Sequence, residues 1–270
     1  MPEVGNKAFL GDIEVNYANL FLGNTNSFIN PYTRGPKVPT NGLFAYYDTA
    51  IPESYSGTGT IWYDISGNAR NLQTVSSSVF PTFDSQNVAF KFNQATNAII
   101  SPQFSTSSLK DTTEVFWTSI PTAKLNTDAG VLGGYQNRIG GGLSGEWDAV
   151  AYGNQGTGWT LASSNAFRPV SSNYQEANSS FVLIVGTRTT NDFKIYRNGN
   201  NVIGSSTSFT PPTITSGFVY VGDSFLQNQG GGEGAFWGDA WFTGSISMYA
   251  LYDRVLSTSE IQAIYDAGRL

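Results

Sequence analysis

Two acidic residues, Glu146 and Asp148, are the side chains of this sequence best placed for enzymatic chemistry. They are two positions apart, so both would lie on one face of a β-strand. Two carboxylates about 5 Å apart can act as nucleophile and acid/base in the hydrolysis of a glycosidic bond. The alternative is a junction between a loop and a strand that carries two solvated acids, and we favour this interpretation.

The composition excludes several other kinds of active site. The chain of 270 residues contains no histidine and no cysteine. It therefore has no Ser-His-Asp triad, no histidine base, no cysteine nucleophile and no thiolate zinc site. A metal would have to bind through oxygen atoms, which leaves Ca²⁺ or Mg²⁺.

Charge and hydropathy limit the expected partners. The net charge is −6 and the 14 basic residues are scattered, so we expect no nucleic-acid partner. No apolar run approaches the ~20 residues of a membrane span, so we expect no membrane insertion. Residues 1–6 lack the basic and apolar regions of a signal peptide, which predicts synthesis and folding in a cytosol.

The rest of the sequence predicts an all-β domain that would position these side chains. Hydrophobic residues make up 40% of the chain and charged residues only 13%, which indicates an ordered core. The pair Asn198-Gly199 predicts a two-residue hairpin turn. We expect strands at residues 42–48, 88–92, 113–118, 148–152, 181–185, 193–196, 201–204 and 218–222.

The C-terminal segment predicts one long strand followed by one short helix. Apolar residues alternate with polar ones, which is the pattern of a half-buried strand. The apolar residues on the expected buried face are Phe242, Ile246, Met248 and Ala250. Ser257 and Glu260 have the spacing of a capping box, and Leu256 and Ile261 have that of a hydrophobic staple. Gly268 is expected to end the helix.

Short motifs along the chain resemble the laminin-G-like, concanavalin A-like jelly-roll family. They are Gly-Leu-Phe-Ala-Tyr-Tyr-Asp at 42–48, Trp-Tyr-Asp-Ile-Ser-Gly-Asn at 62–68, Phe-Lys-Ile-Tyr-Arg-Asn-Gly at 193–199 and Tyr-Asp-Arg-Val-Leu-Ser at 252–257. The resemblance covers residues 41–270. It implies an all-β, concanavalin A-like jelly-roll sandwich with one short C-terminal helix. Such folds are used mostly for glycan binding and surface display, and only sometimes for catalysis.

The resemblance also bears on the acidic pair. Related β-glucanases carry a Glu-x-Asp-x-x-Glu strand, and Glu146 and Asp148 match its first two positions. Ala151 stands where the second glutamate belongs. Because the proton donor is missing, the two-carboxylate mechanism is not supported, and we predict that the protein is not an enzyme.

The same resemblance raises calcium as a cofactor, because some family members bind Ca²⁺ at loop tips through Asp and Asn side chains. The candidate ligands are Asp64, Asn68, Asp223 and Asp239. No Asp-x-Asp-x-Asp spacing is present. Turn formation explains all four without a metal, and Asp64 and Ser66 are expected to bond backbone N–H groups in the Ser66–Asn68 bend. We therefore expect no cofactor, with calcium as the alternative.

Aromatic residues near glycine-rich loops are the candidates for glycan contact. The loops are at 140–142 and 230–234. Aromatic rings beside polar loops can stack on the apolar C–H faces of sugars. The candidate residues are Trp147, Tyr152, Trp159 and Trp237. The alternative is that these rings belong to the core.

Residues 1–40 are predicted to be an attachment arm and linker ahead of the domain at 41–270. Residues 8–15 are echoed by residues 20–27, and each unit predicts a strand, a Gly-Asp or Gly-Asn turn and a second strand. Such a repeat also resembles the leader segments of tailed-phage virion proteins. The alternative is an extra edge strand of the sandwich. The apolar residues of the candidate arm are Phe9, Leu10, Val15, Phe21 and Leu22.

Taken together, these features predict a non-enzymatic virion structural protein of the bacteriophage kind. It would be a capsid decoration or a fibre-type surface component that is made in the host cytoplasm. The expected partners are other virion proteins, further copies of this chain and cell-surface glycans. The first alternative is a stand-alone carbohydrate-binding module or adhesin, and the second is a glycan-cleaving enzyme.

Overall fold

The computed structural model describes the greater part of the chain. The described residues are 7–10, 13–16, 38–74, 79–93, 99–125, 129–136, 147–153, 158–163, 166–172, 174–207, 210–211, 213–222 and 242–268. Within these ranges no helix has the length and apolar character needed to cross a bilayer.

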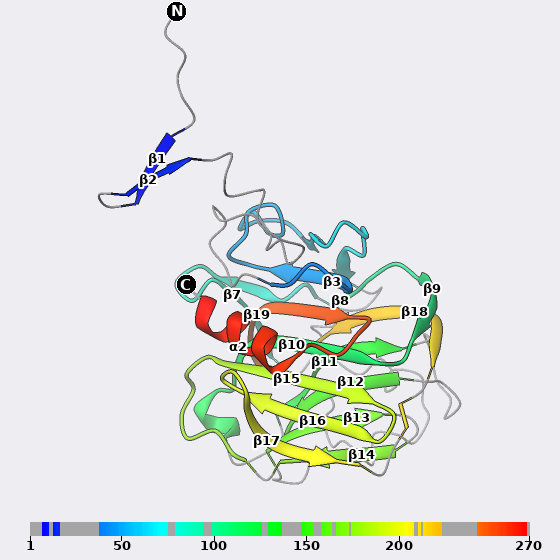
Figure 1. The fold of residues 1–270 in the computed structure, drawn as a ribbon. Coiled ribbons are helices and arrows are strands. Elements are labelled where there is room, and N and C mark those ends of the chain that lie inside the picture. Colours follow the sequence, from blue (N-terminus) through cyan, green and yellow to red (C-terminus); the bar gives the residue numbers. More distant parts are fainter. Residues whose placement is uncertain are drawn as a thin grey trace, which may run out of the picture.

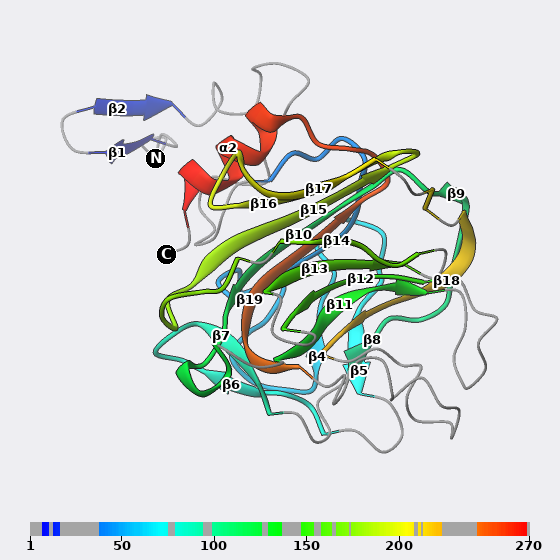
Figure 2. The ribbon, with the colours of Figure 1, turned by 90° about the horizontal axis from the view of Figure 1, so that it is seen from below.

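Two sheets of antiparallel strands pack face to face as a jelly-roll sandwich (Figures 1 and 2). We call them the β10 sheet and the β11 sheet, after a central strand of each. The β10 sheet has the order β17 (Asn201–Ser206), β16 (Asp192–Arg197), β15 (Val182–Thr189), β10 (Thr112–Ser119), β19 (Thr243–Tyr252), β7 (Ala89–Asn93) and β6 (Thr82–Asp84), and β3 (Leu43–Asp48) also pairs with β19. The β11 sheet has the order β14 (Ala166–Ser171), β13 (Trp159–Ser163), β12 (Trp147–Tyr152), β11 (Gly130–Gln136), β18 (Ile214–Val221), β8 (Ile99–Ile100), β5 (Leu72–Thr74) and β4 (Ile61–Trp62), and β9 (Phe104–Leu109) also pairs with β18.

The strands expected from the sequence are confirmed, and so is the all-β sandwich. The turn between β16 and β17 shows why the pair Asn198-Gly199 predicted a hairpin correctly. Asn198 and Gly199 have φ values of 49° and 93°, the left-handed conformation that these two residue types tolerate best. The loop holds residues 198–200, one more than expected, because Arg197 pairs with Asn201.

Two hydrophobic clusters use the two faces of the β10 sheet. The first cluster fills the space between the sheets and includes Phe116 from β10 and Tyr135 from β11. The second cluster lies on the other face of the β10 sheet. There Trp117 of β10 packs with Ile261 and Ile264 of the C-terminal helix α2 (Thr258–Ala267). Both faces of this sheet are therefore covered, as the position of α2 in Figures 1 and 2 illustrates.

Strand β19 departs from the predicted one-sided pattern. Ile246 packs between the sheets, whereas Met248 and Ala250 pack under α2 on the opposite face. A β-bulge causes this change of face. Met248 pairs with Trp117, whereas Ile246 pairs with Thr118, the next residue of β10. Ser247 is therefore an extra residue in β19. The prediction that Phe242, Ile246, Met248 and Ala250 share one face was wrong for that reason.

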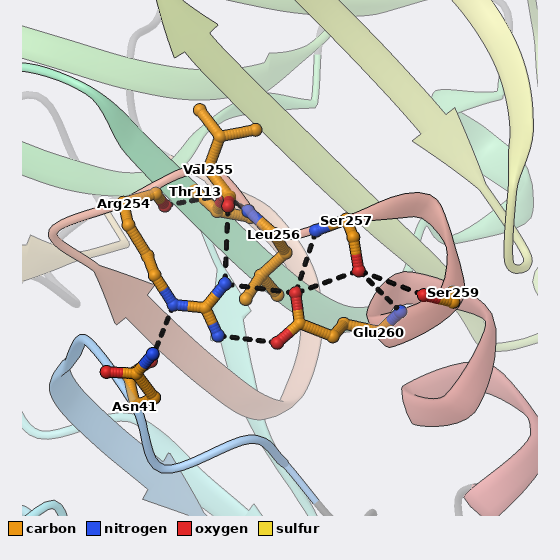
Figure 3. Close-up of polar contacts among 8 residues, drawn as sticks. All are labelled: Asn41, Thr113, Arg254, Val255, Leu256, Ser257, Ser259 and Glu260. Carbon is orange, nitrogen blue, oxygen red and sulfur yellow. Dashed lines mark hydrogen bonds and ion pairs between the residues drawn. The ribbon is translucent and has the colours of Figure 1, made fainter. Parts of the chain in front are cut away.

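The C-terminal helix begins with the predicted capping box (Figure 3). The Ser257 hydroxyl accepts a hydrogen bond from the Glu260 backbone N–H, and the Glu260 carboxylate accepts one from the Ser257 backbone N–H. Leu256 and Ile261, the predicted staple, are both buried in the second cluster. The helix ends at Gly268, whose φ of 74° is one that glycine adopts easily.

Arg254 ties this cap to the body of the sandwich. Its guanidinium donates two hydrogen bonds to the Glu260 carboxylate, at 2.6 and 3.0 Å, and a third to the Asn41 carbonyl oxygen at 2.8 Å (Figure 3). The Thr113 hydroxyl donates to the Arg254 carbonyl and accepts from the Leu256 N–H, both at 2.9 Å. The Tyr-Asp-Arg-Val-Leu-Ser motif thus joins the helix to the ends of β3 and β10.

The charge of Glu260 is expected to make this cap sensitive to pH. Its hydrogen bonds with Arg254 and Ser257 lower the pKa of its carboxyl group from 4.5 to about 2. A lowered pKa in the folded state means that the stabilisation is complete above about pH 4.5 and is lost as the pH falls through about 2. We expect Glu260→Gln to lower the stability at neutral pH by under about 1 kcal/mol, because the pair is partly exposed.

The measurement for Glu260→Gln is the difference in melting temperature between the wild type and the variant across this pH range. The difference should vanish toward pH 2. A difference that stays constant at all pH values would assign the effect to the cap geometry, and charge would play no part.

The N-terminal strands form a small sheet of their own. β1 (Lys7–Leu10) pairs with β2 (Ile13–Asn16), with Phe9 opposite Glu14 (Figure 1). This hairpin confirms the strand, turn and second strand that were predicted for residues 8–15. The second unit, with Phe21 and Leu22, lies outside the described residues. Farther along, Val38 is fully buried in the second cluster, so the packed part of the chain includes residues just before position 41.

Candidate functional site

A polar cleft of about 610 Å³ opens at one end of the β10 sheet. It lies where β10 ends and where β15 and β19 begin, and the turn between β6 and β7 borders it. The described residues that line it are Asn87, Ser119, Pro121, Thr122, Ser179, Ser180, Phe181, Gly244 and Ser245. Its size falls within the range of about 300–1,000 Å³ that is usual for small-molecule sites.

The lining of this cleft is polar but uncharged. Hydroxyl groups come from Ser119, Ser245 and Thr122, and an amide comes from Asn87. The half-buried Phe181, which also packs against the second hydrophobic cluster, adds an apolar side chain. A hydroxyl group both donates and accepts hydrogen bonds, and an amide offers one of each kind of group. Such a lining matches a ligand that carries many hydroxyl groups and some apolar C–H surface.

Several polar contacts hold the turn that carries Asn87. The Asp84 carboxylate accepts hydrogen bonds from the Gln86 N–H at 3.0 Å and from the Asn87 side-chain amide at 2.8 Å. It also forms an ion pair with Lys91 at 2.7 Å. The Lys91 ammonium and the Asn87 amide hold the pKa of Asp84 well below its ordinary value, so Asp84 remains a charged acceptor.

Val88 completes this turn in an unfavourable backbone conformation. Its φ is 46°, which is rare for a β-branched residue. The Thr49 hydroxyl donates to the Val88 carbonyl and lies 2.9 Å from the Ser247 carbonyl of β19, so it links the turn to the sheet. A residue in such a conformation costs on the order of 1–3 kcal/mol and persists only where its surroundings impose it. Asn87 therefore lies between two anchored points of the turn, the Asp84 carboxylate and the Val88 carbonyl.

Comparison with known proteins identifies the family. A family model for the concanavalin A-like lectin/glucanases superfamily matches residues 93–262, which is more than half of the chain. The chain belongs to this superfamily. No curated protein matches it in sequence.

Solved structures of this fold include glycan-related domains. Domain 4 of the GH43 extracellular arabinanase AbnA from Geobacillus stearothermophilus, in complex with arabinotriose, matches with a TM-score of 0.55 and 15% identity over 83% of this chain and 98% of that domain. Trypanosoma rangeli sialidase matches with a TM-score of 0.55 and 14% identity over 86% of this chain. This chain spans only 34% of the sialidase. The binding domain of botulinum neurotoxin DC, in complex with SialylT, matches with a TM-score of 0.50 and 11% identity over 84% of this chain and 51% of that chain. At these identities the comparisons show a shared fold.

Two of the four predicted glycan-contacting residues lie in the core of the sandwich. Tyr152 and Trp159 are buried, and their rings meet edge to face at a centroid distance of 4.8 Å. The structure gives Trp147 as the first residue of β12, and Trp237 lies outside the described residues. Tyr152 and Trp159 therefore both pack in the core.

Hydrogen bonds fix the polar atoms of these two rings inside the protein. The Tyr152 hydroxyl donates to the Leu125 carbonyl at 2.7 Å and accepts from the Glu176 N–H at 2.9 Å. Burial raises the pKa of Tyr152, so its hydroxyl keeps its proton. The Trp159 indole N–H donates to the Glu176 carboxylate at 2.7 Å, and Arg197 binds the same carboxylate at 2.7 and 2.9 Å. Glu176 thus joins Trp159 of β13 to Arg197 of β16.

The acidic pair that resembles the superfamily's glucanase motif is not completed by the fold. β12 pairs with β13 in continuous register from Asp148 to Tyr152, so positions 148 and 151 fall on opposite faces of the strand. Ala151 is buried and carries no proton donor. Glu146 lies outside the described residues. The strand thus does not supply the third acidic position of the motif.

Two of the four candidate calcium ligands, Asp64 and Asn68, take part in a hydrogen-bonded turn. The Asp64 carboxylate accepts hydrogen bonds from the backbone N–H groups of Tyr46, Ser66 and Arg70 at 2.9–3.0 Å. The Asn68 amide donates to the carbonyl of Phe44 at 3.0 Å. Because N–H donors surround the carboxylate, this donor set does not fit a cation, and the predicted bonding of Asp64 to the bend is confirmed.

The other described residues offer no further support for a metal site. Among the described residues there is no group of three or more acidic side chains that could hold a metal ion. Asp223 and Asp239 lie outside the described residues.

Sequence reasoning missed the cleft. Its lining comes from four separate segments, around Asn87, Ser119–Thr122, Ser179–Phe181 and Gly244–Ser245. These segments share no motif or spacing, and serine and glycine are common in turns of any kind. The strand order of the β10 sheet is what brings them together.

Proposed function

We propose that this chain is a glycan-binding domain that does not cleave its ligand. The observation that carries the proposal is the cleft at the end of the β10 sheet, with its hydroxyl and amide groups and one aromatic ring. Sugars present hydroxyl groups at their edges and apolar C–H groups on their faces, so this lining complements them. Domain 4 of the arabinanase, which was solved with arabinotriose, has the same fold over nearly its whole length, which supports the proposal.

The absence of cleavage rests on the residues that line the cleft. The described lining contains no carboxylate, whereas glycoside hydrolysis ordinarily requires a pair of them. The strand that resembles the glucanase motif has Ala151 at its third acidic position, and this alanine is buried. A domain of this kind would hold a glycan without acting on it.

The test is binding of the full chain to a glycan array, followed by titration calorimetry with the best ligand and chromatography of the incubated ligand. We expect binding without new products. Phe181→Ala should weaken the affinity about tenfold, which corresponds to about 1.4 kcal/mol. Tyr63→Ala is the matched control, because Tyr63 is 46% exposed and is not among the residues of the cleft. Release of a shorter glycan, or equal loss in both variants, would contradict the proposal.

We further propose that residues 1–40 attach this domain to a larger assembly, such as the surface of a virion, as a capsid decoration or fibre component. The supporting observation is that β1 and β2 pair with each other, and neither pairs with a described strand of the two sheets. A hairpin of four-residue strands is marginally stable by itself, so an arm of this kind gains its stability from a partner surface.

Light scattering on the full chain and on a chain of residues 38–270 tests the attachment arm. The shorter chain keeps Val38, which is fully buried. We expect an oligomer for the full chain and a folded monomer for the shorter one. Absence of the protein from purified particles of its source would remove the virion setting and leave the glycan-binding proposal intact.

A further inference from the structure

We infer that the cleft at the end of the β10 sheet takes an uncharged sugar, and that Asn87 is the residue that selects it. This inference rests on the proposed glycan-binding function. It adds the chemical class of the ligand and one specificity-determining side chain.

The charge of the cleft argues for the ligand class. No lysine or arginine is found among its described lining residues, which are serine, threonine, asparagine, proline, glycine and phenylalanine. Lys91 is not among the lining residues, and its ammonium group pairs with Asp84 at 2.7 Å. A carboxylated sugar would leave water without gaining a cationic partner, which is unfavourable. A sugar whose only polar groups are hydroxyls can pair them with the hydroxyl and amide groups of the lining, which both donate and accept hydrogen bonds.

The hydrogen bonds of Asn87 orient its amide before any ligand arrives. Its side-chain nitrogen donates to Asp84 at 2.8 Å, which fixes the plane of the amide. Among the described residues, the amide oxygen of Asn87 has no hydrogen-bond partner. This oxygen is available to accept a hydrogen bond from a sugar hydroxyl, and an oriented acceptor loses less conformational entropy on binding than a mobile one.

The strained backbone of Val88 fits the same role. A glycine at position 88 would adopt the observed φ of 46° without strain. The valine therefore does not serve the stability of the turn, and backbone strain of this kind concentrates at functional sites. Valine restricts the backbone beside Asn87, and the Thr49 hydroxyl bonds the Val88 carbonyl, so both the turn and the Asn87 amide have a local anchor next to the cleft.

The experiment uses the full chain and an array on which neutral glycans and their sialylated or uronic-acid counterparts share the same cores. We expect the neutral member of each bound pair to bind at least about tenfold more tightly. Asn87→Ala should weaken that binding about tenfold, as expected for one lost hydrogen bond of about 1.4 kcal/mol. Asn200→Ala is the matched control, because Asn200 is an exposed asparagine of the β16–β17 turn outside the cleft.

The variant Val88→Gly separates a role of Val88 in positioning Asn87 from a role in stabilising the fold. We expect its melting temperature to equal or exceed that of the wild type, because strain is relieved, while its affinity for the neutral glycan falls. An unchanged affinity in Val88→Gly would overturn the positioning role of the turn.

The outcomes on the array test glycan binding, the ligand class and the role of Asn87 separately. Binding restricted to carboxylated glycans would overturn the uncharged ligand and leave glycan binding in place. Neutral binding that Asn87→Ala does not weaken would overturn the role of Asn87. A chain that binds no glycan at all would overturn the proposed function, and this inference with it.

Discussion

Replacing Arg188 with methionine is expected to lower the free energy of unfolding by about 3–5 kcal/mol. Arg188 is fully buried and forms an ion pair with Glu114 at 2.6 Å, and both side chains have no exposed surface. Its guanidinium also donates to the Ala149 carbonyl at 2.7 Å, which links β15 of one sheet to β12 of the other. Methionine fills similar space but leaves the Glu114 carboxylate buried without its counter-charge.

Urea denaturation of Arg188→Met measures this loss, and two variants serve as controls. Lys194→Met removes an ion pair with Asp192 whose side chains are 36% and 44% exposed, and it should cost under about 1 kcal/mol. The double variant Glu114→Gln with Arg188→Met should recover much of the loss, because it leaves no buried charge. A double variant as unstable as Arg188→Met alone would show that lost packing, and not the unpaired carboxylate, causes the effect.

This ion pair marks the limit of what the sequence could predict. Glu114 and Arg188 lie in strands, and the strand at 113–118 was expected from its composition. Their contact depends on the register between β10 and β15, in which Thr112 is opposite Arg188 and Glu114 is opposite Gly186. Register is set by the packing of whole faces, so no local pattern pairs these two residues.

The features that the sequence did predict depend on residues close together in the chain. The capping box joins Ser257 to Glu260, and the bend after Asp64 joins residues two and six positions apart. In each case a side chain bonds a nearby backbone group, so the spacing alone defines the geometry. The bulge at Ser247 broke the pattern of β19, because a single inserted residue exchanges the faces of all that follow.

The candidate site was less predictable than the fold, for a physical reason. Aromatic residues are the usual signal of a sugar site, but a chain with 6 tryptophans and 14 tyrosines also needs them to fill its core. Tyr152 and Trp159 illustrate the ambiguity, since both are buried. The cleft, by contrast, is lined mainly by small polar residues, which carry no signal until the strands bring them together.

Replacing Trp159 with alanine is expected to lower the free energy of unfolding by about 3–5 kcal/mol, because a large buried ring is lost and a cavity remains. The ring packs against Tyr152, and its N–H donates to Glu176 at 2.7 Å. The alanine variant would thus remove both the packing and one of the bonds that hold the Glu176 carboxylate. Urea denaturation is the measurement, and Trp159→Phe, which keeps a ring but not the N–H, should lose less.

The affinity of the folded variant distinguishes a core role for Trp159 from a role in sugar binding. If Trp159 acts only through packing, Trp159→Phe and the folded fraction of Trp159→Ala should bind the glycan as tightly as the wild type. If Trp159 were a stacking surface, Trp159→Ala would lose affinity at least about tenfold while losing little stability. The complete burial of the ring and its hydrogen bond to Glu176 argue for the first result. That result would direct the search for the sugar to the cleft, where Asn87, Ser179 and Ser180 are exposed.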